Sequence, residues 1–288
     1  MPLIRRLRTK AGDALLRRVA GPTAHRKRAR IHGTPGPRWF APDRPVRIVH
    51  ADASMYVGGL AALLLQSLHP VAMAAVWAHS GFRGDPWGRL QRTSTFLAET
   101  TFGTAHDAER AVERVRRVHE RVVGQTSGGV PYRASDPSLL SWVHIAETYC
   151  FLEAHQRYGR SPLTGRQADA YVADMASVAV RLGVEDPPLT LDALVASLRS
   201  RRRELGTTVE SAATARYLLV SPPLPLPARL PYLLLATAAV DLLPRWAREL
   251  LPVPRRVRLL LRFARPGGLA VTAAIRWATP PLPGTAGR

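Results

Sequence analysis

Two arginines and a threonine lie close together within DPWGRLQRTSTFLAETTFG, residues 85–103: Arg92 and Thr93 follow Arg89 by three and four residues. If this stretch is helical, Arg89, Arg92 and Thr93 point to one face. Guanidinium groups beside an apolar pocket could hold the carboxylates of a cofactor or polarise a bound oxidant. The alternative is an ordinary helix surface with two solvated arginines, which is the commonest environment of this residue.

A second stretch, DPSLLSWVHIAETYCFLEAHQRYG, spans residues 136–159 and carries His144 about two turns from its start. Helical spacing places Glu147, Thr148, Phe151 and His155 on the same face as His144. One interpretation is a core histidine that is hydrogen-bonded to a neighbouring helix, and the residues alone favour it. The other is an axial ligand of a haem iron, which needs only one imidazole in an apolar slot.

Several other kinds of chemistry are disfavoured by the sequence. It contains no HExxH, GxSxG, P-loop or GxGxxG motif. It also lacks the paired Glu-x-x-His motifs of a dinuclear carboxylate bundle, so we expect no dinuclear site. Cys150 is the only cysteine, which excludes a disulfide framework and a cysteine-based zinc site.

Helix signals recur along the chain, and strand signals are scarce. Asp85-Pro86 and Asp136-Pro137 each combine a capping carboxylate with proline in the first turn, which predicts helices over 86–102 and 138–158. Glycine follows both predicted helices directly. Similar signals predict helices at 104–123, 164–182, 190–206 and 207–220, then a rigid proline-rich connection at 221–231. His69-Pro70 predicts a kink in the apolar run 58–78. The sequence thus predicts an all-α fold with a single multi-helix domain over 45–250.

The formal net charge of +20 is concentrated at the two ends. Residues 1–50 carry a net +11 and residues 241–288 a net +7, which leaves +2 for the rest. We therefore expect basic extensions at 1–44 and 251–288. Because no nucleic-acid-reading module is recognisable, we expect no specific nucleic-acid partner. No secretory signal or continuous apolar span is visible, which predicts a cytoplasmic protein that can rest on the inner face of the membrane.

The run GGLAALLLQSLHPVAMAAVWAHSGFRGDPWGRLQRTSTFLAETTFG, together with the His144 stretch, resembles the DUF2236 family. This family is related to fungal MpaB and to the bacterial latex-clearing rubber oxygenases, and the resemblance covers residues 45–250. It implies an all-α fold with a globin-like core and a b-type haem. It also implies an oxidoreductase that uses dioxygen on a lipophilic small-molecule substrate.

The rubber oxygenases carry an Arg-x-x-Lys-Thr element near the haem, and Arg89 and Thr93 match its spacing. The resemblance therefore implies catalytic roles for Arg89 and Thr93. Arg92 replaces the lysine, and a guanidinium group is a poor metal ligand, so Arg92 is expected to bind the cofactor rather than the iron. His144 matches the proximal ligand of those enzymes, and His69, His79 and His155 are the next candidates. The catalytic glutamate of those enzymes has no counterpart in residues 58–84, which contain no acidic side chain.

Two functions follow as hypotheses. The first is a haem-dependent oxygenase with Arg89, Arg92, Thr93 and His144 around the cofactor and His144 as the metal ligand. The second is a non-enzymatic helical protein that binds anionic membrane through its basic ends, where arginines alternate with apolar residues. The presence or absence of bound haem would discriminate between them.

Overall fold

Helices joined by loops make up the described chain, apart from a short hairpin between two of the helices. The computed structural model describes residues 2–79, 85–220, 222 and 224–279. The first helices are α1 (Pro2–Ala20), α2 (Ala24–Gly33), α3 (Pro45–Ala51), α4 (Met55–Gln66), α5 (Pro70–His79), α6 (Pro86–Phe102) and α7 (Ala105–Arg121). The antiparallel hairpin strands are β1 (Val123–Gln125) and β2 (Pro131–Arg133).

The second half of the chain is helical as well. Its elements are α8 (Pro137–Tyr158), α9 (Gly165–Leu182), α10 (Leu191–Ser200), η1 (Arg201–Glu204), α11 (Val209–Val220), α12 (Leu226–Leu242), α13 (Arg245–Leu250), α14 (Arg255–Leu260), η2 (Leu261–Phe263) and α15 (Ala264–Ala278). The predicted all-α, single-domain fold is confirmed.

The predicted capping residues begin the helices that matter for the site. The Asp85 carboxylate accepts a hydrogen bond from Gly88 N (2.7 Å), and the Asp136 carboxylate accepts one from Ser138 N (2.7 Å). Thr164 and Gln167 form a reciprocal capping box at the start of α9. These short-range contacts fix where each helix starts, so the start can be predicted from sequence.

Two sequence expectations need correction. Residues 221–231 are not a proline-rich connection throughout, because α12 already begins at Leu226 and includes Pro231. Tyr232 supports this early start, since its hydroxyl donates to Leu218 O on α11 (2.8 Å). The scarcity of strand signals also gave no indication of the hairpin. Residues 221 and 223 lie outside the described residues.

The expected kink at His69-Pro70 is a break between two helices. α4 ends at Gln66 and α5 starts at Pro70. His69 Nδ1 accepts a hydrogen bond from Ala72 N (3.3 Å), so the histidine caps the new helix at its first turn.

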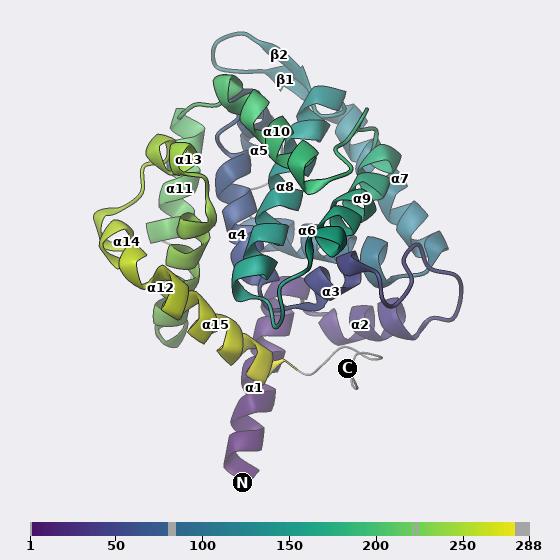
Figure 1. The fold of residues 1–288 in the computed structure, drawn as a ribbon, viewed down its shortest axis with the longest axis vertical. Coiled ribbons are helices and arrows are strands. Elements are labelled where there is room, and N and C mark those ends of the chain that lie inside the picture. Colours follow the sequence, from purple (N-terminus) through teal and green to yellow (C-terminus); the bar gives the residue numbers. More distant parts are fainter. Residues whose placement is uncertain (1, 80–84, 221, 223, 280–288) are drawn as a thin grey trace.

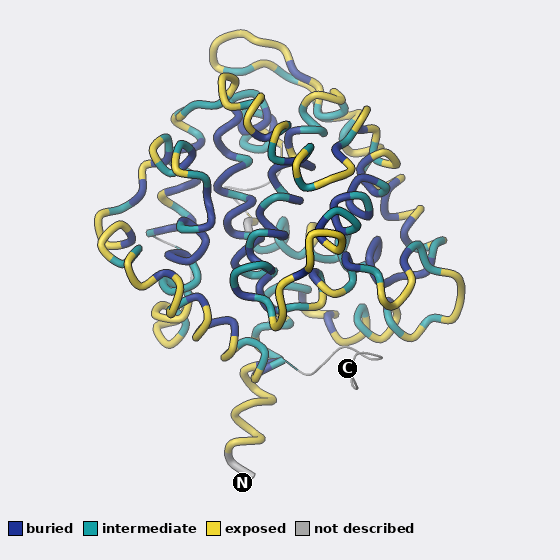
Figure 2. The backbone as a smooth tube through the Cα atoms, viewed as in Figure 1, coloured by how far each residue is buried: buried dark blue, intermediate teal, exposed yellow. Residues whose placement is uncertain are grey.

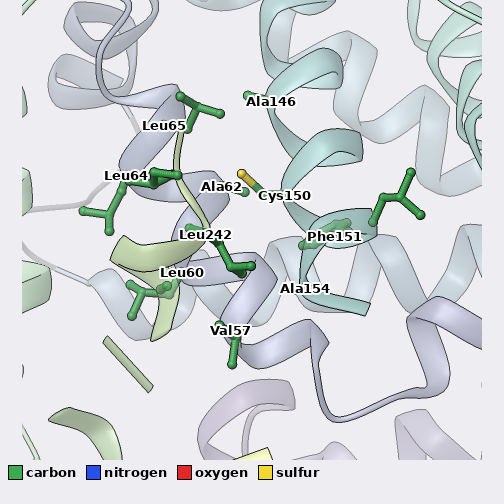
Figure 3. Packing of buried hydrophobic residues seen from close by; sticks show 14 of the residues in the cluster. Val57, Leu60, Ala62, Leu64, Leu65, Ala146, Cys150, Phe151, Ala154 and Leu242 are labelled. Carbon is green, nitrogen blue, oxygen red and sulfur yellow. The ribbon is translucent and has the colours of Figure 1, made fainter. Parts of the chain in front are cut away.

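The core lies between α4 and α8, which run side by side through the middle of the molecule (Figures 1 and 3). α4 contributes Val57, Leu64 and Leu65, and α8 contributes Cys150 and further small or aromatic side chains. Gly58 allows the close approach, because a Cβ there would lie 3.0 Å from Cys150 O. Burial of each large aliphatic side chain stabilises the fold by about 1.5–3 kcal/mol.

The remaining helices cover this central pair on two sides. α3, α6, α7 and α9 pack together on one side, while α12, α14 and α15 cover the other (Figure 1). The hairpin lies at one end of the long axis, and the first half of α1 projects at the opposite end (Figures 1 and 2).

Both basic ends of the chain are folded where they are described. α1 packs against α6 and α15, and at Gly12 a Cβ would overlap the Ala278 carbonyl. Arg276 on α15 pairs with Asp52 at the end of α3 through Nη2–Oδ1 (2.7 Å) and Nε–Oδ2 (3.0 Å). These contacts join the two terminal helices to the body.

No single helix among the described residues is long and apolar enough to cross a bilayer. Within the described parts of the chain, only the pair α3 and α4 reaches the required length and composition together, and the two are bent by 94° relative to each other.

Candidate functional site

His144 lies in the first half of α8 with its side chain almost completely buried (7% exposed). Its Nδ1 lies 3.3 Å from Thr148 Oγ1, one turn further along the helix. Its Nε2 is buried and has no hydrogen-bond partner among the described residues. Burial lowers the pKa of His144 to about 4, so the ring is neutral at physiological pH.

This environment fits an axial ligand of haem. A neutral imidazole binds iron through one nitrogen while its other N–H is held by a neighbouring group. With the proton on Nδ1 donated to Thr148 Oγ1, the lone pair of Nε2 is free. No three His, Cys, Asp or Glu side chains gather as a metal site in the part of the chain that the structure describes. A haem needs only the single imidazole from the protein.

α6 turns one face to α1 and the opposite face away from it. Gln91 Nε2 donates to Arg18 O (3.3 Å), and Ser94 Oγ donates to Val19 O (2.7 Å). Arg89 and Thr93 each lie two positions from Gln91, which places them on the other side of the helix. The predicted helical arrangement of Arg89 and Thr93 on one face is therefore present.

Arg89 and Arg92 have different environments. Arg89 is partly buried, and burial, followed by the charge of Arg92, lowers the pKa of its guanidinium to about 10. The Arg92 side chain is 64% exposed, with Nη1 3.7 Å from Asp85 Oδ2. Thr93 is exposed. Of the three residues, Arg89 is the most buried.

His50 on α3 connects the end of α6 with the middle of α8. Its Nδ1 lies 2.8 Å from Thr101 Oγ1, and its ring packs edge-on against Phe151 at a centroid distance of 5.6 Å. Thr93 and His144 each precede this junction by about two helical turns along their own helices. No hydrogen bond of His144 within the described residues reaches Arg89, Arg92 or Thr93, so their common site stays a prediction.

His50 also packs against Tyr171 on α9, and Glu147 on α8 acts electrostatically on Tyr171; we call these three residues the His50 cluster. The His50 and Tyr171 rings lie 6.0 Å apart at 77°. His50 Nε2 and the Tyr171 hydroxyl are buried without a hydrogen-bond partner among the described residues. Burial raises the pKa of Glu147 to about 7 and lowers that of His50 to about 3. Burial, and next the charge of Glu147, raise the pKa of Tyr171.

Sequence reasoning placed Glu147 on the face of His144 but gave it no role, and it missed His50 and Tyr171. A helical spacing signal exists for Glu147, which lies three residues after His144. None exists for His50 and Tyr171, because α3 and α9 meet α8 only through tertiary packing.

The other histidines considered as ligands differ from His144. Both nitrogens of His69 have neighbours, since Nδ1 accepts from Ala72 N and Nε2 lies 3.7 Å from Glu204 Oε2. His79 is exposed at the end of α5, with its ring 6.1 Å from that of Tyr132. His155 is buried with an unpartnered Nδ1, and the charges of Asp52 and Arg276 act on it. His155 is therefore the alternative closest in character to His144.

Residues 46–274 match the model of a family of oxygenase catalytic domains, described as ER-bound oxygenase mpaB/B′/rubber oxygenase. The chain belongs to this family, and the resemblance drawn from its motifs is confirmed. The match spans α4, α6 and α8, and it also includes most of α15. Neither the curated proteins nor the solved structures contain a significant match. Family membership supports an oxygenase kind of function in general terms, with dioxygen and a small-molecule substrate.

Proposed function

We propose that this protein is a haem-b-dependent oxygenase that acts with dioxygen on a lipophilic substrate. The observation that carries the proposal is the neutral, buried imidazole of His144, whose Nε2 has no hydrogen-bond partner among the described residues. Membership of an oxygenase family supports the same chemistry. Haem b, when bound, would supply the iron that reacts with dioxygen.

In this proposal His144 holds the iron through Nε2. Thr148 is the positioning residue, because its hydroxyl accepts the Nδ1 proton of His144 and fixes both the tautomer and the orientation of the ring. The apolar surroundings keep the ring neutral, which leaves the lone pair available over the physiological pH range.

Arg89 and Thr93 would line the reaction pocket and orient dioxygen. A guanidinium group carries five N–H donors and no lone pair for a metal, so Arg89 can stabilise negative charge but cannot bind iron. Arg92 is more exposed, which suits a partner for a propionate at the edge of a haem or for a polar group of the substrate.

We assign Glu147 to proton transfer within the same site. Its carboxyl group lies on the face of α8 that carries His144, and it acts electrostatically on Tyr171. A pKa of about 7 lets the group both accept and release a proton near neutral pH. The predicted position of the protein at the inner face of a membrane belongs to this proposal as well.

The first experiment is an absorption spectrum of the purified protein after expression with a haem supply. We expect a Soret band in the parent, and its loss or shift in His144→Ala, because that variant lacks the axial nitrogen. His155→Ala and His69→Ala serve as matched controls and should keep the band of the parent. Added imidazole should restore the band of His144→Gly by occupying the space of the ring.

Two results would contradict this proposal in different ways. A folded, helical protein that shows no Soret band after reconstitution with haemin would exclude the haem. A band that persists unchanged in His144→Ala would retain the haem but move the ligand to another side chain, with His155 the first to substitute.

A further inference from the structure

α15 lies on the surface with an apolar face turned outward. Leu269 and Trp277 (47% exposed) point to solvent, and the outward positions between them are alanines. Val271 and Thr272 point inward, and Arg276 is held by Asp52. The outward face therefore carries no charged side chain beyond Arg265 at its start.

Neighbouring elements continue this apolar surface. Leu226 (74% exposed) and Leu230 stand at the start of α12, while Leu259 and Phe263 are exposed on α14 and η2. α12 packs against α14, η2 and α15, and exposed stretches of the backbone of these elements lie together in the lower left of Figure 2. We call the exposed residues of α12, α14, η2 and α15 the terminal face.

The terminal face is strongly basic. Its exposed arginines are Arg229, Arg255, Arg256, Arg258, Arg262 and Arg265. None of them has a carboxylate within ion-pair distance in the described part of the chain. The guanidinium carbon of Arg262 lies 4.8 Å from the centroid of the Phe263 ring, so a cationic and an apolar side chain lie against each other on this surface.

The first half of α1 adds to the terminal face. Ile4 and Leu7 are exposed there beside Arg5, Arg6 and Arg8. α1 contacts α15 through the close approach of Gly12 to Ala278, and its free half projects beyond the body (Figure 1). A projecting basic helix with apolar side chains is typical of interfacial anchors.

We propose that the terminal face, together with the first half of α1, docks the protein peripherally on an anionic lipid bilayer. Apolar side chains can enter the boundary between headgroups and acyl chains while the arginines bind lipid phosphates. Trp277 suits this boundary, since indole rings favour the membrane interface. A second copy of the chain is a poor occupant, because two such faces would bring like charges together. Nucleic acid would leave the apolar side chains unused.

This inference does not depend on haem, since the terminal face lies on other elements than His144. It complements the proposed function, because a lipophilic substrate dissolved in a bilayer would be available at the surface on which the protein rests.

The test is flotation of the full chain with vesicles of phosphatidylcholine alone or mixed with phosphatidylglycerol, at low and high salt. We expect binding only to the anionic vesicles, weakened by salt. Leu269→Glu/Trp277→Glu and Arg255→Gln/Arg258→Gln/Arg262→Gln should each reduce the partition coefficient about tenfold or more. Brominated lipid should quench the tryptophan fluorescence of the parent, and Trp277→Phe should remove part of this quenching.

Matched controls carry the same changes elsewhere. Leu189→Glu/Val209→Glu alters two exposed apolar side chains, one in the loop before α10 and one at the start of α11, and Arg110→Gln/Arg116→Gln/Arg117→Gln removes three exposed arginines of α7. Both controls should bind like the parent, and thermal melts should show that all variants are folded.

Equal binding to zwitterionic and anionic vesicles, or an equal loss of binding in variants and controls, would overturn the proposal. The proposal would also be overturned if the parent formed a dimer and bound no vesicles, while the Leu269→Glu/Trp277→Glu variant was a monomer. The Soret band, read in the same samples, separates this outcome from failure of the oxygenase proposal.

Discussion

Glu147 is a single side chain whose burial makes the stability of the whole fold depend on pH. Its pKa of about 7 lies above the ordinary value of 4.5, so the folded protein keeps a proton that the unfolded chain has released. The contribution of Glu147 to the free energy of unfolding therefore falls as the pH rises from about 4.5 to about 7, and this contribution changes no further above that interval.

We predict that Glu147→Gln removes this slope. At pH 8 the variant without haem should be more stable than the parent by about 1–3 kcal/mol, since no buried carboxylate has to be charged. At pH 5 the two should be nearly equal. Urea denaturation at both pH values measures the difference, with the exposed Glu113→Gln as a control. Parallel stability profiles for parent and Glu147→Gln would mean that Glu147 is solvated in the folded protein.

The buried histidines act in the opposite direction. Burial lowers the pKa of His50 to about 3 and that of His144 to about 4, so the unfolded chain binds protons between pH 6.5 and these values while the folded chain does not. Stability is therefore lost as the pH falls below 6.5. The histidines raise the free energy of unfolding up to about pH 6.5, and Glu147 lowers it up to about pH 7. The protein without haem therefore has its stability maximum at near-neutral pH.

At the scale of elements, the pair of Arg276 and Asp52 joins α15 to the end of α3. The Asp52 side chain is only 7% exposed, and after the opposing effect of burial its pKa is lowered by the hydrogen bonds from Arg276 and Ser54. This contribution to stability is present above the ordinary pKa of an aspartate and is lost as the pH falls through the lowered value.

We predict that Arg276→Ala destabilises the protein by about 3–5 kcal/mol, because it leaves a buried carboxylate without its cation. Arg276→Ala/Asp52→Leu should recover part of this loss, since no charge then remains buried. Chemical denaturation of both variants and of Asp52→Leu closes the cycle. If the double variant is as unstable as Arg276→Ala, the guanidinium stabilises α15 by packing rather than by charge.

The sequence predicted elements best where local contacts decide them. Asp85, Asp136 and the Thr164–Gln167 box were found because a cap and its helix lie within four residues. Prediction was poorer where tertiary contacts decide. α12 includes Pro231 and is joined to α11 by the hydrogen bond of Tyr232, and the hairpin depends on pairing between strands with little local preference.

The same distinction applies to the candidate site. Spacing along one helix placed Arg89 with Thr93 and His144 with Glu147 and Thr148, and both arrangements are present. The junction at His50 could not be predicted, because its partners Thr101 and Phe151 come from two other helices. Helix faces are properties of sequence, whereas the distance between two helices is set by everything that packs around them.

At the scale of the whole molecule, Gly12 sets how closely α1 approaches α15. We predict that Gly12→Val separates these helices, because a Cβ would overlap the Ala278 carbonyl, and costs about 1–3 kcal/mol. Hydrogen exchange should rise in α1 and in the last turns of α15 and stay unchanged in α4. Gly128→Val in the hairpin turn is the control, since its Cβ would meet only Thr126 Oγ1 at 3.9 Å. Unchanged exchange in Gly12→Val would mean that α1 shifts without cost.

The packing of α1 against α15 also has a practical consequence for labelling the molecule. The first and the last described helices meet near one pole, where α15 contributes to the terminal face, while the β1–β2 hairpin occupies the opposite pole (Figure 1). A fluorophore or affinity tag fused to either of these helices lies next to the terminal face, and it can obstruct binding of that face to a bilayer. A probe in the turn around Gly128 and Gly129 is held at the far end, which suits it for immobilising the protein in a defined orientation.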